Sequence, residues 1–476
     1  MQLDGPVTSL DPAKGGSFQD VSVAWALYDP LINLDADGKI VAGLATSWKA
    51  TASSATFNLR SGVTCSDGTP LTAQIAADSL NHFFDPATAA PFGSAVIGAG
   101  NTAKAKASNS QVTITLDKPF SGLLAGMTTP YTGIVCPAGL KAPDTLLTGS
   151  DGTGPYIAAS QVAGDSYTFT RREGYTWGPK FSGVETAGEM PKQLVMKVVE
   201  DETTRANLQS TSKLDISGYP SDAWKRFDGQ AGYTKKTVPQ SDTFLLFNQS
   251  EGHATQDKKI RLAISQAIDR TQLNAVQSYG AGELISNLGE PTYDCYDDSV
   301  ASLIPAPDVP AASQVLKGVK LRIIGTILLA GGDANSYVLS ALQAAGADVT
   351  LQNMNNQAWV SDLFSTKNDW DVTILVFANV PSNLLSGANF YAGAVPPKGQ
   401  NLSAVKNPAA EAALQQARET TGAQSCKALS DFHKALLENN DTVPLATAPS
   451  NVIFAGGTTA FVSKGFIRAG TIRVAG

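Results

Sequence analysis

Three histidines and four cysteines are the residues of this chain best suited to act as bases, nucleophiles or metal ligands. His82, His253 and His433 are spread along the chain, and no cysteines form a CxxC motif, so a zinc site is poorly supported. The patterns GxSxG, GxxxxGKS/T and HExxH are absent. We therefore expect no catalytic residue, no bound metal and no cofactor. Non-covalent binding is the favoured class of chemistry.

Acid–base catalysis by a pair of carboxylates is also weakly supported. Asp29, Asp67 and Asp151 lie near turns, where aspartate is common because its side chain bonds the neighbouring backbone. His82 lies in a predicted helix beside two phenylalanines and is expected to make structural contacts. An enzyme is therefore the less favoured interpretation of these residues.

The segment 238–244 is a candidate wall of a binding site. Side chains alternate between the two faces of a strand, which places Gln240, Asp242 and Phe244 on one face. An amide, a carboxylate and an aromatic ring could together hydrogen-bond and stack on a small molecule. An ordinary strand edge, with Gln240 and Asp242 in solvent, is the alternative.

A second candidate wall follows a region in which strand and helix patterns alternate. Strands are predicted at 321–326, 348–351 and 371–377, with helices near 335–345 and 358–364. This alternation predicts parallel strands joined by crossover helices. Ligands of open α/β sheets bind beyond the carboxyl ends of the strands, and this end carries Phe377, Asn379 and Val380.

Size and charge exclude several classes of protein. With 476 residues the chain is long enough for about three domain-sized units. A net charge of −7 argues against nucleic acid as a partner, because nucleic-acid binding needs a basic face. No apolar run approaches the length of a membrane span. No basic and apolar leader precedes Gln2, so any export signal is expected to lie outside this chain.

Four sequence motifs resemble one known family. They are LYDPLINLDADGKIVAGLATSWKA at 27–50, TFNLRSGVTCSDGTPLTA at 56–73, GTGPYIA at 152–158 and DKKIRLAISQAIDR at 257–270. In this order they resemble the large extracellular solute-binding proteins of ABC importers, the class that includes oligopeptide, dipeptide and nickel receptors. The resemblance extends from about residue 10 to about residue 455.

The resemblance implies an α/β, two-lobed periplasmic-binding-protein-like fold with an additional inserted α/β subdomain. Lobe I would comprise 1–33, 152–243 and 443–476, lobe II would be the insert 34–151, and lobe III would comprise 244–442. Chain crossings near 243 and 442 would form a hinge, because a few residues can absorb the change in backbone angles.

The same resemblance implies the partners and the location of the protein. The expected partners are a small-molecule ligand and an ABC permease in the membrane, and the protein is expected to be a monomer. It would be extracellular, either as a membrane-anchored lipoprotein or as a periplasmic protein. A receptor for an oligosaccharide or an amphipathic metabolite, a hydrolase using the same cleft, and a surface protein without a transport role are the alternatives.

The resemblance also implies a third wall of the site, in the loop 14–19. Related receptors present an acid and backbone groups from this loop, whereas this chain has Gly16 where the acid is expected. The predicted binding residues of the loop are Gly16, Ser17, Phe18 and Gln19. Trp25, Trp177 and Trp359 could also stack on a ligand, although core packing is the more common role of such rings.

Peptide-binding relatives carry an aromatic residue and then an aspartate in the loop after 377, and this aspartate pairs with the ammonium group of the peptide. Here Phe377 matches the aromatic residue, but Val380 stands at the acidic position and Ile374 stands where a basic residue can occur. Asn379 could still offer a neutral hydrogen bond. Either Asp242 replaces the missing acid, or the ligand is neutral or blocked.

The four cysteines allow three pairings or four free thiols on sequence alone. The resemblance favours two disulfides in an exported protein. It places Cys65 and Cys136 in one lobe and Cys295 and Cys426 in another. We therefore predict the pairs Cys65–Cys136 and Cys295–Cys426, because a bridge between lobes would obstruct closure.

Overall fold

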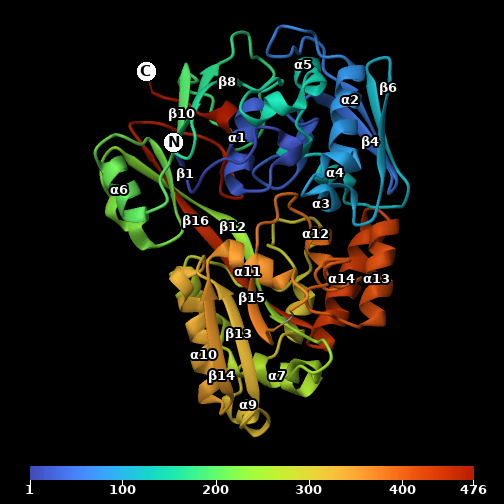
Figure 1. The fold of residues 1–476 in the computed structure, drawn as a ribbon, viewed down its shortest axis with the longest axis vertical. Helices are drawn as coiled ribbons and strands as arrows, with labels where there is room; N and C mark the ends of the chain where they lie inside the picture. Colours follow the sequence, from blue (N-terminus) through green and yellow to red (C-terminus); the bar gives the residue numbers. More distant parts are fainter. Residues whose placement is uncertain (368, 476) are drawn as a thin grey trace. The chain divides into compact units, whose positions relative to one another are not determined.

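The computed structural model describes residues 1–367 and 369–475, which form two compact units (Figure 1). Unit 1 comprises Met1–Val238 and the segment that begins at Ser450, and unit 2 comprises Pro239–Pro449. The divisions fall inside β12 (Tyr233–Phe247) and β16 (Thr442–Ala455), so continuous strands make both chain crossings. The crossings predicted near 243 and 442 lie in these same strands. A separate lobe at 34–151 remains a prediction.

One sheet of unit 1 is antiparallel and four-stranded, with the order β4-β5-β7-β6. Its strands are β4 (Ala45–Ala50), β5 (Ser54–Leu59), β6 (Ala103–Ser108) and β7 (Gln111–Leu116). The buried positions Phe57, Val112 and Ile114 alternate with more exposed ones, as expected for a sheet with one covered face. Helix α2 (Ala73–Phe84) packs on β6 and begins after Thr72, whose Oγ1 accepts from the Ile75 amide.

A second sheet of unit 1 has the order β1-β10-β9-β8. Its strands are β1 (Gln2–Leu3), β8 (Tyr156–Val162), β9 (Ser166–Arg171) and β10 (Gln193–Val198). The other helices and strands of unit 1 are α1 (Phe18–Leu27), β2 (Ile32–Leu34), β3 (Ile40–Ala42), α3 (Gly93–Ile97), α4 (Leu123–Gly126), α5 (Pro137–Lys141), α6 (Glu202–Ser210), β11 (Ile216–Tyr219), β17 (Val462–Ser463) and β18 (Phe466–Ile467). Buried apolar side chains of α1, the second sheet, β11, β17 and β18 form a core of the unit.

The motif at 152–158 is explained by a close approach of two backbones. A Cβ atom at Gly154 would lie 2.3 Å from the Leu27 carbonyl carbon and 2.5 Å from the Tyr28 amide nitrogen. A Cβ atom at Gly152 would lie 2.4 Å from the Leu27 carbonyl oxygen. The Gly154 amide also donates to that oxygen (3.0 Å). Both glycines are therefore needed so that β8 can start against the end of α1.

We expect Gly154→Ala to lower the free energy of unfolding of unit 1 by about 3 kcal/mol or more, because backbone atoms must move to admit the new methyl group. Gly93→Ala is the matched control, since its Cβ atom would lie 4.0 Å from the Ala90 Cβ atom, an ordinary van der Waals contact. Calorimetric unfolding of both variants measures the difference. Equal stability of the two variants would contradict this explanation of the motif.

Unit 2 contains the parallel strands predicted from the sequence. β13 (Lys320–Thr326) pairs in parallel with β14 (Asp348–Met354) and with β15 (Val372–Phe377). Helices α10 (Asp333–Ala344) and α11 (Asn356–Leu363) form the connections. The residues 242–247 of β12 pair antiparallel with β15. The predicted order of strands and helices in this region is confirmed to within a few residues at each boundary.

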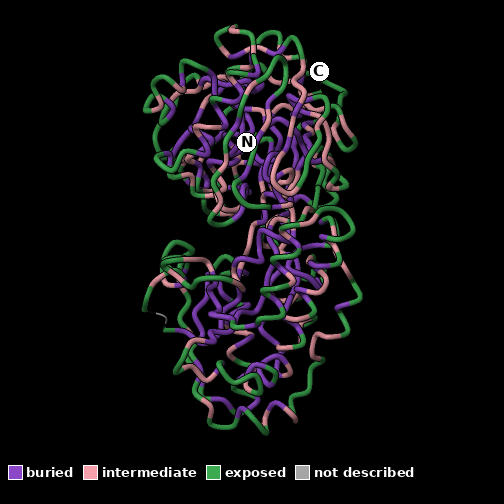
Figure 2. The backbone as a smooth tube through the Cα atoms, turned by 90° about the vertical axis from the view of Figure 1, so that its right-hand side faces the viewer, coloured by how far each residue is buried: buried purple, intermediate pink, exposed green. Residues whose placement is uncertain are grey.

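The remaining helices of unit 2 are α7 (Lys258–Ala267), α8 (Arg270–Gln277), α9 (Val309–Leu316), α12 (Leu384–Ala388), α13 (Pro408–Glu419) and α14 (Ala423–Glu438). Apolar residues of α7, α9 and α10 form a core with the strands. The two disulfides are Cys65–Cys136 in unit 1 and Cys295–Cys426 in unit 2, so both predicted pairs are confirmed. Buried segments lie in the interior of each unit in Figure 2.

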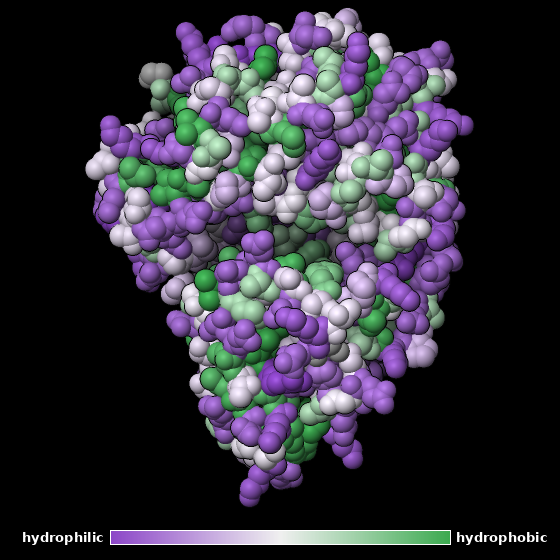
Figure 3. Space-filling view, in the orientation of Figure 1, coloured by the Kyte–Doolittle hydropathy of each residue, from purple (hydrophilic) through white to green (hydrophobic). Residues whose placement is uncertain are grey.

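The visible surface is mostly hydrophilic, with apolar residues gathered in patches (Figure 3). In unit 2 the exposed large apolar side chains include Ile327, Leu328, Val360 and Phe364. None of the described helices combines the length and the apolar character needed to cross a lipid bilayer.

Candidate functional site

The loop 14–19 of unit 1 is held in place by Asp20. Ser17 caps α1 through its Oγ atom, which accepts from the Asp20 amide (3.1 Å). In return, Asp20 Oδ2 accepts from the amides of Gly16 and Ser17, both at 3.0 Å. Asp20 is buried and also accepts from Thr8. The nearest acid of the loop therefore serves the fold, while Gly16 is exposed and Ser17, Phe18 and Gln19 are half-buried.

The aromatic side chains proposed for stacking have different environments. Phe18 stacks on Phe466 with 5.2 Å between ring centroids. Trp25 is buried beneath the guanidinium of Arg468, whose Cζ lies 3.1 Å from the ring centroid. Trp359 is buried and donates to Thr373 Oγ1 (3.0 Å). Of these rings, Phe18 is the one that keeps a half-exposed face.

Trp177 belongs to a buried polar cluster around Asp29. The Tyr175 hydroxyl donates to Asp29 Oδ1 (3.0 Å), and Trp177 Nε1 donates to Oδ2 (3.1 Å). Burial raises the pKa of the Asp29 carboxyl to about 7, although these hydrogen bonds and the charges of Arg172 and Arg468 act in the opposite direction. Burial also lowers the pKa of Arg468 to about 9. The sequence pattern gave no sign of Arg468, which lies far along the chain from its partners.

In unit 2, the strand face predicted from alternation is present. Asp242 lies opposite Phe377 and Phe244 lies opposite Leu375 in the β12–β15 ladder, and directly paired residues project to the same face. Asp242 and Phe244 are buried, while Gln240 and Phe377 are half-buried. The Phe377 ring meets the Phe390 ring edge to face, with 5.0 Å between centroids.

Tyr293, which the sequence did not suggest, is the partner of Asp242. Its hydroxyl donates to Asp242 Oδ2 (3.1 Å). Burial and the negative charge of Asp242 raise the pKa of Tyr293 well above its ordinary value, so the phenol stays protonated as a donor. The ring lies against Gly289, where a Cβ atom would be 2.4 Å from Tyr293 Cδ2. Only glycine at position 289 leaves room for this arrangement.

The loop that carries Tyr293 is fixed at several points. Cys295 is bonded to Cys426 of α14, and Asn287 Nδ2 donates to the Asp297 carbonyl (2.9 Å). The Leu288 amide donates to His433 Nε2 (3.4 Å). Burial lowers the pKa of His433 to about 4, so its imidazole is neutral and can accept at Nε2. These contacts position Tyr293 on Asp242.

The loop after β15 presents neutral groups. Asn379 is buried, and its Nδ2 donates to the Asn383 carbonyl (2.6 Å). Val380 is half-buried at the position where the resemblance places an acid. Ile374 is buried in the ladder opposite Leu245. The structure thus brings Asp242, Phe377 and Asn379 together within unit 2, and their role in binding remains a prediction.

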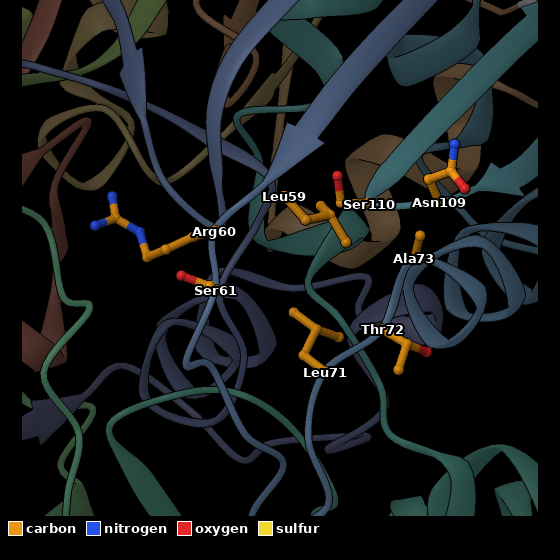
Figure 4. Close-up of a pocket in the computed structure, with 8 residues that line it drawn as sticks. All are labelled: Leu59, Arg60, Ser61, Leu71, Thr72, Ala73, Asn109 and Ser110. Atoms are coloured by element: carbon orange, nitrogen blue, oxygen red, sulfur yellow. The ribbon is translucent and has the colours of Figure 1, made fainter.

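A cavity of about 290 Å³ lies elsewhere, in unit 1. It is formed where β5 ends and α2 begins (Figure 4). Its lining residues are Leu59, Arg60, Ser61, Leu71, Thr72, Ala73, Asn109 and Ser110. Figure 4 shows that the Arg60 side chain extends away from the other lining residues. None of the predicted binding residues lines this cavity.

Among the described residues, Asp294, Cys295 and Cys426 form one group close enough together to hold a metal. The two sulfur atoms are bonded to each other, so neither is available as a thiolate ligand.

Comparison with known proteins identifies relatives of the chain. Over 323 residues it is 28% identical to the periplasmic murein peptide-binding protein MppA of Escherichia coli K12, a match that covers 63% of this chain and 56% of the relative. It is 25% identical over 354 residues to the nickel-binding periplasmic protein of the same organism, covering 68% of this chain and 65% of the relative. The chain therefore matches little more than half to two thirds of the length of these curated relatives.

Solved structures match over a longer range. A substrate binding protein from Microbacterium hydrocarbonoxydans, complexed with 4-hydroxybenzoate hydrazide, is 33% identical, with a TM-score of 0.85 over 100% of this chain and 99% of the other. NikA from Brucella suis, in complex with Fe(III)-EDTA, shares the fold at 19% identity and a TM-score of 0.83, covering 100% of this chain and 99% of the other. These matches confirm the predicted α/β, two-lobed fold.

The family model for the middle part of the bacterial extracellular solute-binding proteins, family 5, matches residues 39–398. This range includes three of the four motifs from which the resemblance was drawn, and half of the fourth. The chain belongs to the bacterial extracellular solute-binding proteins of family 5.

Proposed function

We propose that this protein is the extracellular receptor of an ABC importer, which captures a small organic ligand and delivers it to a membrane permease. Membership of the family supports this proposal. So does the match over 99% of the length of a substrate binding protein. Binding of the ligand would favour a closed form by population shift. We further propose that the protein acts as a monomer, either periplasmic or anchored as a lipoprotein.

The side chains around Phe377 favour a ligand without a free ammonium group. Asp242 accepts a hydrogen bond from Tyr293, and the loop after β15 offers Asn379 and Val380 in place of a carboxylate. A buried ammonium group without a paired acid would be unfavourable by several kcal/mol. The paired rings of Phe377 and Phe390 favour an aromatic or other flat group. The neutral side chains of the loop after β15, beside the aromatic pair, are the single observation that carries the choice of ligand class.

The names of the relatives show that the ligand differs from one relative to another. The substrate binding protein from Microbacterium hydrocarbonoxydans was crystallised with 4-hydroxybenzoate hydrazide, an aromatic ligand without an α-ammonium group. The two curated relatives are named for murein peptide and for nickel. We propose an uncharged aromatic ligand for this chain, with a neutral oligosaccharide or an amphipathic metabolite as the alternative.

We also propose that the ligand is released without chemical change. Two histidines contact aspartates, His82 with Asp11 (3.1 Å) and His253 with Asp371 (2.8 Å). Neither pair is completed by an activated nucleophile among the described residues. The hydroxyl near His82 belongs to Thr88, and it donates to the His82 carbonyl. The group next to His253 Nε2 is the side-chain amide nitrogen of Asn248, which is not a nucleophile.

Calorimetric titration tests the ligand class. The panel comprises uncharged aromatic amides and hydrazides, neutral oligosaccharides and free dipeptides. We expect an uncharged aromatic compound to bind at least about 10-fold more tightly than any free dipeptide, since an unpaired charge is the larger penalty. Tighter binding of free dipeptides would overturn the proposed class, and turnover of a bound compound would overturn the receptor role.

A further inference from the structure

Three buried polar atoms lie without a hydrogen-bond partner in one short segment of unit 2. They are Asn379 Oδ1, Asn383 Nδ2 and Ser386 Oγ, and none of the described residues satisfies them. Asn379 is only 1% exposed and Ser386 only 6%. Buried polar groups are nearly always paired in folded proteins. Three exceptions within residues 379–386 therefore call for a partner that the chain itself does not supply.

In both asparagines the second atom of the side-chain amide already makes a hydrogen bond. This bond determines whether the unpaired atom is the donor or the acceptor. Asn379 Nδ2 donates to the Asn383 carbonyl (2.6 Å), so the free atom of Asn379 is an acceptor. Asn383 Oδ1 accepts from the Ser386 amide (3.0 Å), so the free atom of Asn383 is a donor. Rotating either amide would break its present hydrogen bond. The segment therefore offers one fixed acceptor, one fixed donor and a hydroxyl that can do either.

We propose that residues 379–386 recognise an amide-type group of the ligand, that is, a carbonyl beside an N–H. The ligand N–H would donate to Asn379 Oδ1, and its carbonyl would accept from Asn383 Nδ2 and the Ser386 hydroxyl. This inference rests on the proposed receptor function and specifies the functional group that the receptor selects. The ring attached to that group would lie against Phe377, two residues before Asn379.

Most hydrogen bonds of the segment are local, and one isolated bridge pairs Asn383 with Asp294. Besides the two amide contacts, the Ser382 amide donates to the Asn379 carbonyl (2.9 Å). Residues 378–386 contribute nothing to the β12–β15 ladder, which ends at Phe377. The three atoms are enclosed in this structure, so contact with a ligand requires a small displacement of side chains, which leaves the β12–β15 ladder intact.

The same atoms exclude charged groups. A carboxylate carries acceptors only, so it would set an oxygen against Asn379 Oδ1. An ammonium group carries donors only, so it would leave Asn383 Nδ2 without an acceptor. An ester has the carbonyl but lacks the N–H. A series of compounds that share one ring and differ in this group therefore separates the possibilities.

The test is calorimetric titration of the full chain with benzamide, methyl benzoate, benzoate and benzylamine. We expect benzamide to bind about 10-fold or more tightly than methyl benzoate, because the ester leaves Asn379 Oδ1 unpaired. Benzoate and benzylamine should bind more weakly still. Hydrogen exchange should slow at 379–386 with benzamide. The absence of binding by all four compounds, or equal binding of benzamide and methyl benzoate, would overturn the inference.

Two variants show whether Asn379 determines the ligand selectivity. Asn379→Leu should abolish the preference for benzamide over methyl benzoate, and Asn379→Asp should reverse the preference between benzamide and benzylamine. Asn335→Asp is the matched control, since Asn335 is also 1% exposed but is paired with Thr326 and Asn353. If an internal water satisfied the segment, Asn379→Leu would leave selectivity unchanged, and the inference would fail. The receptor proposal would survive that result, since it fails only if no ligand of the wider panel binds.

Discussion

Replacement of Arg261 by methionine is expected to lower the free energy of unfolding of unit 2 by about 3–5 kcal/mol, because it leaves a buried carboxylate unpaired. Arg261 is 2% exposed and Asp441 is 0% exposed. Arg261 Nη2 lies 3.3 Å from Asp441 Oδ1. Nη2 also donates to the Asn439 carbonyl, and the other nitrogens donate to the backbone carbonyls of Thr255, Gln256 and Asn440. One side chain of α7 thus fixes both the start of its own helix and the entry to β16.

The variant Lys259→Met is the control, because Lys259 is exposed on the same helix and its loss should change stability by less than about 0.5 kcal/mol. Hydrogen exchange of the α7 and α14 amides measures unit 2 separately from unit 1. The double variant Arg261→Met with Asp441→Asn should recover part of the loss, because the carboxylate charge is gone. A loss below about 1 kcal/mol in Arg261→Met would contradict this role.

Removal of the Cys295–Cys426 disulfide by serine substitution at both positions is the second large expected effect. The bridge joins residues 131 apart in sequence, and a loop of this length corresponds to a loss of about 4–5 kcal/mol in the chain-entropy model. Cys295 lies two residues after Tyr293. We therefore expect ligand affinity to fall as well, since the loop no longer holds the phenol on Asp242.

The Cys65–Cys136 bridge of unit 1, which joins residues 71 apart, provides the matched control. Its removal should lower stability by a similar amount, about 4 kcal/mol, without loosening Tyr293. Calorimetric unfolding and ligand titration of both double variants separate the two effects. An equal change of affinity in the two variants would contradict the positioning role of the Cys295–Cys426 bridge.

Much of the fold could be predicted because local pattern and final structure agree. In 320–377 each apolar run is bounded by polar connections, and the parallel strands follow directly. Thr72 could be identified as a helix cap from its place before α2. The long strands can be predicted only in part from the sequence. Residues 447–455 of β16 include the buried polar residues Thr447, Ser450 and Asn451, and a strand buried on both faces, as β16 is, does not show the alternation of a half-exposed one.

A site residue could be predicted only where the pattern of its own segment was enough to place it. Asp242 was found by alternation and Phe377 by its place at the end of a strand. Tyr293 could not be found, because its link to Asp242 spans 51 residues and depends on the space above Gly289. Arg468 was missed for the same reason, since it meets Trp25 from the other end of the chain. The disulfide pairing came from the resemblance, since the spacing of the cysteines allows every pairing.

Small-angle X-ray scattering tests the receptor role most directly. It should be recorded on the purified chain before and after saturation with the tightest ligand found by titration. We expect the radius of gyration to decrease on binding, as the ligand shifts the population toward a closed form. An unchanged radius of gyration at saturation would contradict ligand capture by closure. It would therefore contradict the proposed receptor mechanism.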